Sequence, residues 1–334
     1  MKPLVSVIVP VHNDELYVGD AIKSLLDQTY SNLEILVIDD ASIDSTLDIV
    51  MLAKHSRIRV FRNITNLGLA ASVNLAIRQA SGKYIARMDA DDLSAPTRIE
   101  KQIQFMERHP EIDIVGTAMQ SFGYGNYVHQ FPIDHDACKA RLLFNVCFGH
   151  PTVLIKKSVF NDPTNYYKDE LQQYSEEYEL WCRLVDRYRF ANLREPLVKY
   201  RTFKPTIKQE AERKRRINSF TIRKNFIEKQ FGTQSAGQYQ KHDLISNLAK
   251  AKSVTQIEEW ISWLQRMREI NYELKRFGAD ALQLELSNRC FEVRYWNSQL
   301  GLQNMLNCYF KDDSRYSPTM KQNLRFIMKS IGKF

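Results

Sequence analysis

The sequence predicts an α/β protein with a mostly parallel central sheet flanked by helices, followed by a C-terminal helical extension. Three observations lead to this prediction. Short apolar runs alternate with amphipathic segments over residues 5–109. Small polar clusters stand directly after several of these runs. The charge also shifts along the chain, since residues 206–334 hold 23 basic and 13 acidic residues whereas residues 1–205 hold 24 and 26.

Four apolar runs predict strands at residues 5–9, 33–38, 58–61 and 84–88. Helical spacing predicts helices at 20–28, 44–53 and 69–80, and Pro96 suits the first turn of a helix that runs to residue 109. Strands that alternate with helices form a parallel sheet. Farther on, the pattern predicts strands at 152–155 and 197–200 and a helix at 177–188, and it is almost entirely helical from residue 208.

Three polar clusters follow predicted strands, at residues 11–13, 39–42 and 89–92. In sheets of this kind, ligands bind beyond the carboxyl ends of the strands. The coincidence of three clusters with three strand ends therefore predicts a binding site at that edge of the sheet.

The last of these clusters contains Asp89 and Asp91, two carboxylates that can share one hard divalent cation such as Mg²⁺ or Mn²⁺. Such a cation would neutralise charge on a departing diphosphate. Taken alone, this turn is better explained as a solvated acidic cap of the helix at Pro96, but its place at the end of the fourth strand favours the metal. In the cluster after the second strand, Asp40 could accept a hydrogen bond from a base or ribose, or it could cap a helix. Residues 10–15, after the first strand, could be a plain loop between a strand and a helix.

Several protein classes are poorly supported. Neither GxGxxG nor GxxxxGK[ST] occurs, which argues against a dinucleotide dehydrogenase or a P-loop enzyme. The five cysteines show no CxxC spacing, which favours a reducing compartment over disulfides or a zinc site. No run approaches the ~18 apolar residues that span a bilayer, and the N-terminus lacks signal-peptide features. We therefore expect a cytoplasmic protein, or one held peripherally on the cytoplasmic face of the inner membrane.

Five blocks of the chain resemble the inverting family 2 glycosyltransferases with a GT-A fold: SVIVPVHN, SLLDQTYSNLEILVIDDAS, NLGLAASVNLAI, GKYIARMDADDLSAPTRIEKQ and EEYELW. The resemblance covers about residues 4–203 and is greatest to bacterial transferases that build lipo-oligosaccharide, O-antigen or capsule. It implies inverting transfer of a hexose or N-acetylhexosamine from a UDP-sugar to a hydroxyl of an oligosaccharide or lipid-linked glycan, assisted by Mn²⁺ or Mg²⁺.

The resemblance also implies roles for residues at matching positions. Asp40 matches the residue that binds the uracil ring, Asp89 the first carboxylate of the DxD motif, and Asp91 the chief metal ligand, with Asp92 as a further contact. The full set of positions expected to contact the nucleotide is Pro10, Val11, Asn13, Glu15, Asp40, Asn74 and Asp89.

The last block carries the expected general base, which takes the proton of the acceptor hydroxyl during its attack. The family usually has Asp where this chain has Glu177, so the resemblance implies Glu177 as the base and Glu176 as the fallback. From the residues alone, an acidic run also suits the first turn of a helix. His150 could touch the acceptor or the pyrophosphate, or be structural, and relatives often carry His where Phe203 stands.

The charge shift predicts a nucleotide-sugar-binding catalytic domain at residues 1–205 and a basic, mainly helical region at 206–334. Three basic amphipathic segments could contact an anionic membrane surface, form a helical subdomain with solvated basic faces, or make a dimer contact. They lie around Arg213–Arg216, Trp260–Arg268 and Asn323–Phe334. No nucleic-acid-binding motif accompanies the charge.

Two other functions stay open from the sequence. A nucleotidyltransferase also pairs such a sheet with carboxylate-bound Mg²⁺, but it would usually show a glycine-rich basic loop where this chain has PVHNDE. A catalytically inactive module that binds a glycan or a partner enzyme is the second alternative, because Glu177 departs from the usual Asp.

Overall fold

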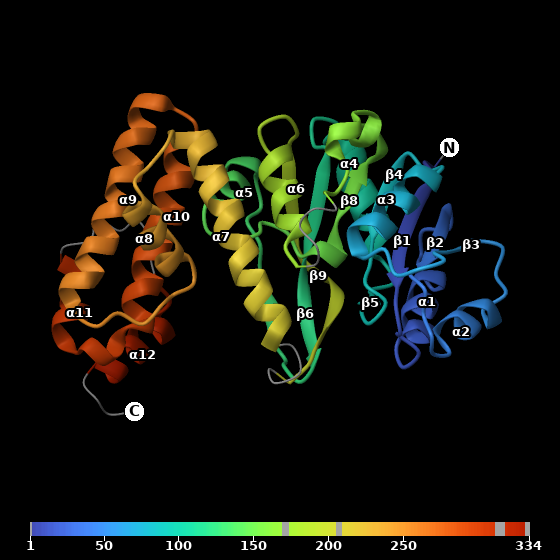
Figure 1. Ribbon diagram of the computed structural model, residues 1–334, viewed down its shortest axis with the longest axis horizontal. Coiled ribbons are helices and arrows are strands. Elements are labelled where there is room, and N and C mark those ends of the chain that lie inside the picture. The colour runs from blue at the N-terminus through green and yellow to red at the C-terminus, as the bar shows by residue number, and fades with distance from the viewer. Residues whose placement is uncertain (1, 169–173, 205–208, 311–317, 331–334) are drawn as a thin grey trace. The chain divides into compact units, whose positions relative to one another are not determined.

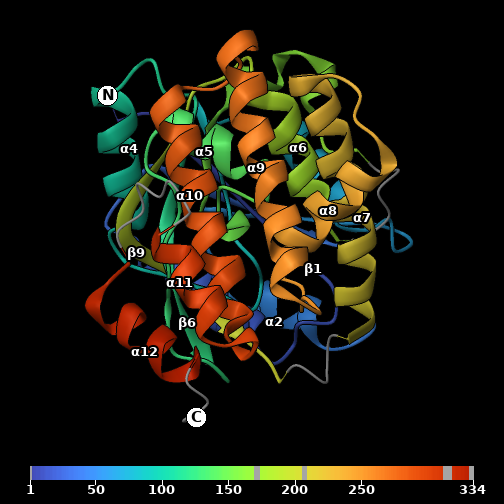
Figure 2. The ribbon, with the colours of Figure 1, turned by 90° about the vertical axis from the view of Figure 1, so that its left-hand side faces the viewer.

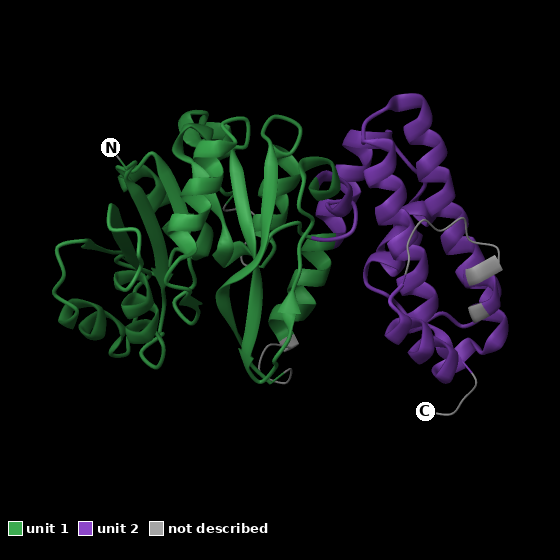
Figure 3. Ribbon diagram, turned by 180° about the vertical axis from the view of Figure 1, so that it is seen from behind, with its two compact units in different colours: residues 1–138, 146–219 green, residues 139–145, 220–334 purple. Residues whose placement is uncertain are grey.

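The computed structural model describes residues 2–168, 174–204, 209–310 and 318–330 (Figure 1). Contacts divide the chain into two compact units, shown in Figure 3: residues 1–138 with 146–219, and residues 139–145 with 220–334. The domain boundary predicted at residue 205 falls on residues 205–208, which lie outside the described part of the chain, and it stays a prediction.

The first unit is built on one sheet with the strand order β3-β2-β1-β4-β8-β6-β9-β5, and β7 pairs with β6. The strands β1 to β4 are parallel, whereas β8 is antiparallel to both of its neighbours. The strands are β1 Val5–Val11, β2 Leu33–Asp39, β3 Ile58–Arg62, β4 Tyr84–Arg87, β5 Leu93–Ser94, β6 Ile114–Gly123, β7 Val128–His129, β8 Leu154–Lys156 and β9 Phe190–Thr202.

Helices flank this sheet and make up most of the second unit (Figure 1). The α-helices are α1 Val18–Leu26, α2 Thr46–Leu52, α3 Leu69–Gln79, α4 Arg98–Arg108, α5 His135–Arg141, α6 Glu176–Leu184, α7 Gln209–Phe231, α8 Ala236–Ser246, α9 Val254–Leu274, α10 Ala279–Trp296, α11 Leu302–Phe310 and α12 Met320–Ser330. Short 3₁₀ helices are η1 His150–Thr152, η2 Lys157–Asn161, η3 Pro163–Asn165 and η6 Ser298–Leu300.

The register of the parallel strands brings their carboxyl ends together. Every residue of β1 is buried. Its last residue, Val11, pairs with Asp39 of β2, and Ile8 pairs with Arg87 of β4. The chain moves from β1 to β2 to β3 and then returns to β4 on the other side of β1. Right-handed crossovers therefore place α3 on the face opposite α1 and α2, and leave a crevice beyond β1 and β4.

The predicted α/β fold class is confirmed, and the differences lie in the later elements. The four predicted parallel strands are present. The helix predicted to include Pro96 begins only at Arg98, with Thr97 as its N-cap. The predicted strand at 197–200 is part of the much longer β9, and β6 was not predicted, because its residues alternate too little in polarity to indicate a strand.

Helices α8 to α12 make up most of the second unit (Figure 2), and His242 of α8 is buried inside it. His242 bonds through Nε2 to the Leu143 carbonyl oxygen at 2.6 Å, and Trp263 Nε1 donates to His242 Nδ1 at 3.2 Å. Because an indole N–H can only donate, the imidazole carries its proton on Nε2. Burial lowers the pKa of His242 to about 3, so the ring is neutral. This network ties residues 139–145 into the helical unit.

Only some residues of the basic amphipathic pattern in the C-terminal region lie on the surface. Trp260, Trp263 and Leu264 are buried in the core of the second unit, which corrects the expectation that they could face a membrane. On α7, Arg213 and Arg215 form ion pairs with Glu210 and Glu212 of their own helix. In the part of the chain that the structure describes, we find no helix with the length and hydropathy that a bilayer crossing requires.

Candidate active site

A cleft of about 320 Å³ opens at the carboxyl ends of β1, β2 and β4. Its size suits a small-molecule ligand. It brings together five of the predicted site residues: Pro10, Val11, Asp40, Asp89 and Asp91. The remaining lining residues are His12, Asp14, Asn66, Gly68, Leu69, Ser72, Ala90, Tyr174 and Glu176.

Asp40 holds the loop that leads into α3. Its Oδ1 accepts from the Asn63 side-chain amide at 2.7 Å and from the Leu67 N–H at 2.8 Å, and its Oδ2 accepts from the Gly68 N–H at 2.8 Å. Gly68 has φ 86°, a left-handed conformation that glycine adopts without a steric penalty. A carboxylate offers about four acceptor positions. Asp40 therefore shapes one wall of the cleft and keeps one position on Oδ2 for a ligand.

His12, which sequence reasoning did not assign, connects two of the cleft loops. Its Nδ1 lies 2.8 Å from the Asp40 carbonyl oxygen, so Nδ1 carries the proton. Its Nε2 therefore accepts from the side-chain amides of Asn13 and Asn66, each at 3.1 Å. The only sequence signal for this role was the position of His12 directly after a buried strand.

Asn13 and Glu15 face the loop before α2 and are absent from the cleft lining. Asn13 adopts φ 57°, and its side-chain oxygen accepts from the Ile43 N–H at 3.0 Å. Glu15 accepts from the Ser45 N–H at 3.0 Å. These contacts join the loop after β1 to the loop after β2, and through them both residues shape the cleft.

The acidic turn after β4 concentrates negative charge. Carboxylate oxygens of Asp89, Asp91 and Asp92 all lie within 4.8 Å of one another. Asp92 is fully buried, and its Oδ1 accepts from the Arg201 N–H at 2.8 Å, whereas its Oδ2 has no hydrogen-bond partner within the described residues. Burial and the charges of Asp89 and Asp91 raise the pKa of Asp92 to about 9. An orphaned buried oxygen beside two carboxylates fits a hard cation.

Three arginines, none of them assigned from the sequence, hold this turn. Arg87 is buried and forms an ion pair with Asp89, and its Nε and Nη1 have no hydrogen-bond partner among the described residues. Arg98, also buried, donates to the Arg87 carbonyl oxygen at 2.8 Å. Arg201 lies between the rings of Tyr17 and Phe122, at 4.3 and 4.4 Å from their centroids, and donates through Nε to the Asp91 carbonyl oxygen at 2.9 Å.

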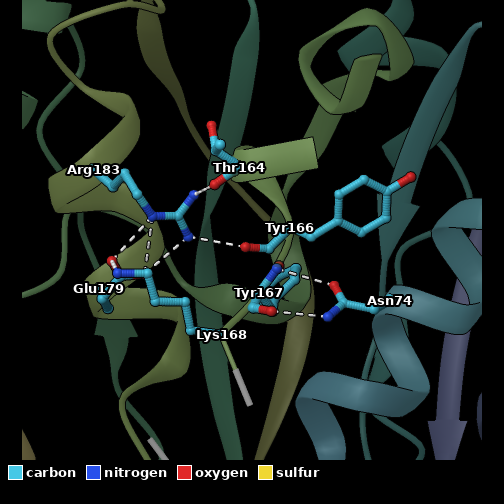
Figure 4. Close-up of polar contacts among 7 residues, drawn as sticks. All are labelled: Asn74, Thr164, Tyr166, Tyr167, Lys168, Glu179 and Arg183. Carbon is cyan, nitrogen blue, oxygen red and sulfur yellow. Dashed lines mark hydrogen bonds and ion pairs between the residues drawn. The ribbon is translucent and has the colours of Figure 1, made fainter. Parts of the chain in front are cut away.

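Asn74 supports the site from outside the cleft (Figure 4). Its side-chain amide donates to the Tyr167 carbonyl oxygen at 2.8 Å and accepts from the Tyr167 N–H at 3.0 Å. The hydroxyl of Tyr167 bonds to His150 Nε2 at 2.9 Å. Burial and the positive charge of Arg87 lower the pKa of His150 well below its usual value, so its ring is neutral. Asn74 thus acts on His150 through Tyr167.

A second set of contacts joins the segment that carries Tyr167 to α6 (Figure 4). Arg183 donates to the carbonyl oxygens of Thr164 and Tyr166 and pairs with Glu179, which also pairs with Lys168 at 3.1 Å. These contacts fix the segment that carries Tyr167 against the helix that carries the candidate base.

The two candidate bases stand side by side at the start of α6. Oxygen atoms of Glu176 and Glu177 and a ring nitrogen of His150 lie within 4.8 Å of one another. Glu176 lines the cleft, and its buried Oε2 has no hydrogen-bond partner within the described residues. Burial, followed by the charge of Glu176, raises the pKa of Glu177 to about 7. A carboxylate with a pKa near neutrality can accept a proton at physiological pH.

The chain is similar to a large set of glycosyltransferases. The profile described as Glycosyl transferase family 2 matches residues 6–162. The chain is 37% identical over 206 residues to EpsE of Bacillus subtilis, covering 60% of this chain and 73% of EpsE. It is 31% identical over 237 residues to the Escherichia coli O-antigen biosynthesis glycosyltransferase WbnJ, covering 68% of this chain and 90% of WbnJ.

A third relative has a named donor and acceptor. It is the E. coli UDP-Glc:alpha-D-GlcNAc-diphosphoundecaprenol beta-1,3-glucosyltransferase WfgD, 33% identical over 190 residues, with 54% of this chain and 70% of WfgD covered.

Two solved structures share the fold. Residues 1–349 of Staphylococcus aureus TarS, in complex with UDP-GlcNAc, align with TM-score 0.56 and 19% identity, covering 90% of both chains. The Pyrobaculum calidifontis mannosyltransferase PcManGT, in complex with GDP-Man and Mn²⁺, aligns with TM-score 0.53 and 15% identity, covering 94% of this chain and 89% of that one.

The three hydrogen bonds of Asp40 predict a stability effect. In Asp40→Ala, the Asn63 amide and the N–H groups of Leu67 and Gly68 lose their acceptor, so we expect the free energy of unfolding to fall by about 2–3 kcal/mol in urea titrations. The exposed Asp48→Ala is the control and should change it by less than about 0.5 kcal/mol. Equal values for the two variants would contradict the anchoring role of Asp40.

Proposed function

Because the chain belongs to glycosyl transferase family 2, we propose that it transfers a hexose or N-acetylhexosamine from a UDP-sugar to a hydroxyl of a surface-glycan acceptor, with inversion at the anomeric carbon. One observation carries this proposal. A single cleft joins the loop after β1, Asp40 after β2 and the acidic turn after β4.

The cleft offers a fitting place for the nucleotide. Asp40 keeps one acceptor position, which suits the single N–H donor of a uracil ring. Pro10 and Val11 line the adjoining wall. Two relatives support UDP as the carrier, since TarS was solved with UDP-GlcNAc and WfgD is named for UDP-Glc. Asn13, Glu15 and Asn74 would support the nucleotide site through the loops that they hold.

Asp91 and Asp89, with Asp92 beside them, would hold Mn²⁺ or Mg²⁺. Such an ion, when bound, neutralises charge on the diphosphate that leaves with the nucleotide. PcManGT was solved with Mn²⁺, which supports the assignment. Arg87 keeps Asp89 oriented and balances part of the negative charge when the turn holds no ion.

Glu177 is the proposed general base. Its carboxylate takes the proton of the acceptor hydroxyl while that oxygen attacks the anomeric carbon on the side opposite the departing UDP. One displacement inverts this carbon, so an α-linked donor gives a β-linkage. Glu176, beside it, raises the proton affinity of Glu177, and Arg87 and Arg215 lower it.

The family assignment leaves the inactive binding module as the alternative to exclude. An inactive relative could keep the fold and lose the chemistry. UDP release separates the two, with UDP-glucose and UDP-N-acetylglucosamine as donors and a GlcNAc-diphosphate-lipid as acceptor. If the chain binds UDP but releases no UDP from either donor, with or without Mn²⁺, the proposed transfer is wrong.

We predict that Asp91→Asn lowers Mn²⁺-dependent UDP release by at least about 100-fold, because a missing metal ligand removes several kcal/mol of charge stabilisation. Calorimetry should show weaker Mn²⁺ binding by the same variant. Asp48→Asn, at an exposed position of α2, is the matched control and should behave as the wild type. Unchanged Mn²⁺ affinity in Asp91→Asn would contradict the ligand assignment.

The pKa of Glu177 predicts a pH dependence. The base is active only when ionised, so the transfer rate should fall as the pH drops below about 7. Glu176→Gln removes a neighbouring negative charge, so the fall in the transfer rate should move to lower pH.

Glu177→Gln should retain UDP binding, and its transfer rate should fall by at least about 100-fold. If Glu176→Gln loses transfer and Glu177→Gln keeps it, the roles of the two are reversed.

We also propose that α12 contacts an anionic lipid surface. Met320, Leu324 and Ile327 follow one helical face and are 89%, 59% and 38% exposed, whereas Phe326 is buried. Lys321 and Arg325 stand beside them. Apolar residues flanked by cations suit the headgroup boundary of an anionic bilayer, and a lipid-linked acceptor would be found there. Ile331 and Lys333 of the same predicted segment lie outside the described residues.

Vesicle sedimentation tests this contact. Leu324→Glu should reduce binding to vesicles of phosphatidylglycerol and phosphatidylcholine by about tenfold or more, since it places a charge where an apolar side chain would be buried. UDP release from the donor in the reaction with a soluble acceptor should not change. The exposed Leu244→Glu, on α8, is the control. Equal vesicle binding by both variants would contradict the role of α12.

A further inference from the structure

Glu176 and Glu177 follow two residues with a left-handed backbone. Tyr174 has φ 75° and Ser175 has φ 101°, and neither is glycine. L-residues rarely adopt this conformation, because Cβ approaches the backbone carbonyl oxygen. Strained residues of this kind persist only where the surrounding structure holds them, and they gather at functional sites. The turn therefore needs an external support.

The first half of α7 supplies that support. The side-chain amide of Asn218 donates to the Tyr174 carbonyl oxygen at 2.9 Å. The hydroxyl of Ser175 lies 3.2 Å from the Ser219 hydroxyl and donates to the Arg215 carbonyl oxygen at 3.4 Å. All of these residues belong to the first compact unit.

Ser175 does not act as a normal helix cap. Serine at an N-cap usually has an extended backbone and accepts from an N–H of the first turn. Ser175 is the N-cap of α6, yet its side chain makes no capping hydrogen bond, and the residue is only 3% exposed. Its hydroxyl is directed to α7 instead. The local preference of the sequence is thus overridden by contacts with a distant helix.

We propose that Asn218, with Ser219, is a positioning residue for the general base. By holding the Tyr174–Ser175 turn in its left-handed form, it aims the start of α6 so that Tyr174 and Glu176 line the donor cleft and Glu177 stands beside Glu176 and His150. This inference rests on the proposed function, because it assigns a support to the base of that reaction.

Kinetics of Asn218→Ala test the proposal. We expect kcat for transfer to fall by about tenfold or more, because small displacements of a reacting group are costly. The donor KM and the affinity for UDP should stay within about twofold, since the nucleotide wall of the cleft is held by Asp40. Ile217→Ala, an exposed neighbour on α7, is the control and should retain the wild-type kcat.

A pair of substitutions at Ser175 tests the strain itself. Ser175→Gly and Ser175→Ala both lose the hydroxyl, but only alanine keeps the steric penalty of the left-handed backbone. We expect the glycine variant to melt about 2–4 °C above the alanine variant, while its kcat is no higher. If the glycine variant is more stable than the alanine variant but reacts no faster, then the hydroxyl of Ser175 positions the turn and does not merely stabilise it.

The outcomes separate this inference from the proposed function. Wild-type turnover combined with an Asn218→Ala kcat equal to that of Ile217→Ala would overturn the positioning role alone. Equal melting temperatures for Ser175→Gly and Ser175→Ala would overturn the strained turn. A wild-type chain that binds UDP and releases none would overturn the proposed function, and with it any base for Asn218 to position.

Discussion

The site depends on the electrostatic balance of the turn after β4. Asp89, Asp91 and Asp92 bring carboxylates within 4.8 Å of one another, and one of these residues is fully buried. Like charges at this separation repel strongly in a medium of low dielectric constant, and this repulsion, added to burial, raises the pKa of Asp92 to about 9, so that Asp92 is mostly protonated near neutral pH. Arg87 offsets part of the repulsion through Asp89, Arg98 holds the backbone beneath, and Arg201 anchors the turn through Asp91 and Asp92. The surplus of negative charge faces the cleft, where a cation would be bound.

The sheet topology explains why this turn meets the other cleft residues. The register of β1 with β2 and β4 places Asp40 and the acidic turn on either side of the loop after β1. His12 then links that loop to Asp40 and to Asn66. Backbone pairing in the core therefore fixes the positions of groups that are far apart in sequence, and side-chain hydrogen bonds of Asp40 and His12 then hold the loops.

A second layer of contacts holds the side of the cleft that carries the candidate base. Asn74 holds Tyr167, which bonds to His150, and Arg183 joins the same segment to α6 (Figure 4). The α7 contacts to Tyr174 and Ser175 belong to the same layer. These residues touch the backbone of segments that carry functional side chains. Such supports set the orientation of reacting groups, on which catalysis depends more than on their mere presence.

The sequence by itself determined the α/β class, the parallel strands β1 to β4 and the placing of Asp40, Asp89 and Asp91 at strand ends, because buried parallel strands have a local apolar signature. It also indicated the family through blocks of consecutive residues. Only the tertiary structure decided that Asn13, Glu15 and Asn74 lie outside the cleft lining and that Glu176 lines it. The contacts of Arg87, Arg98 and Asn218 were likewise invisible in the sequence, because each depends on a partner brought near by folding, and no local pattern encodes such a pairing.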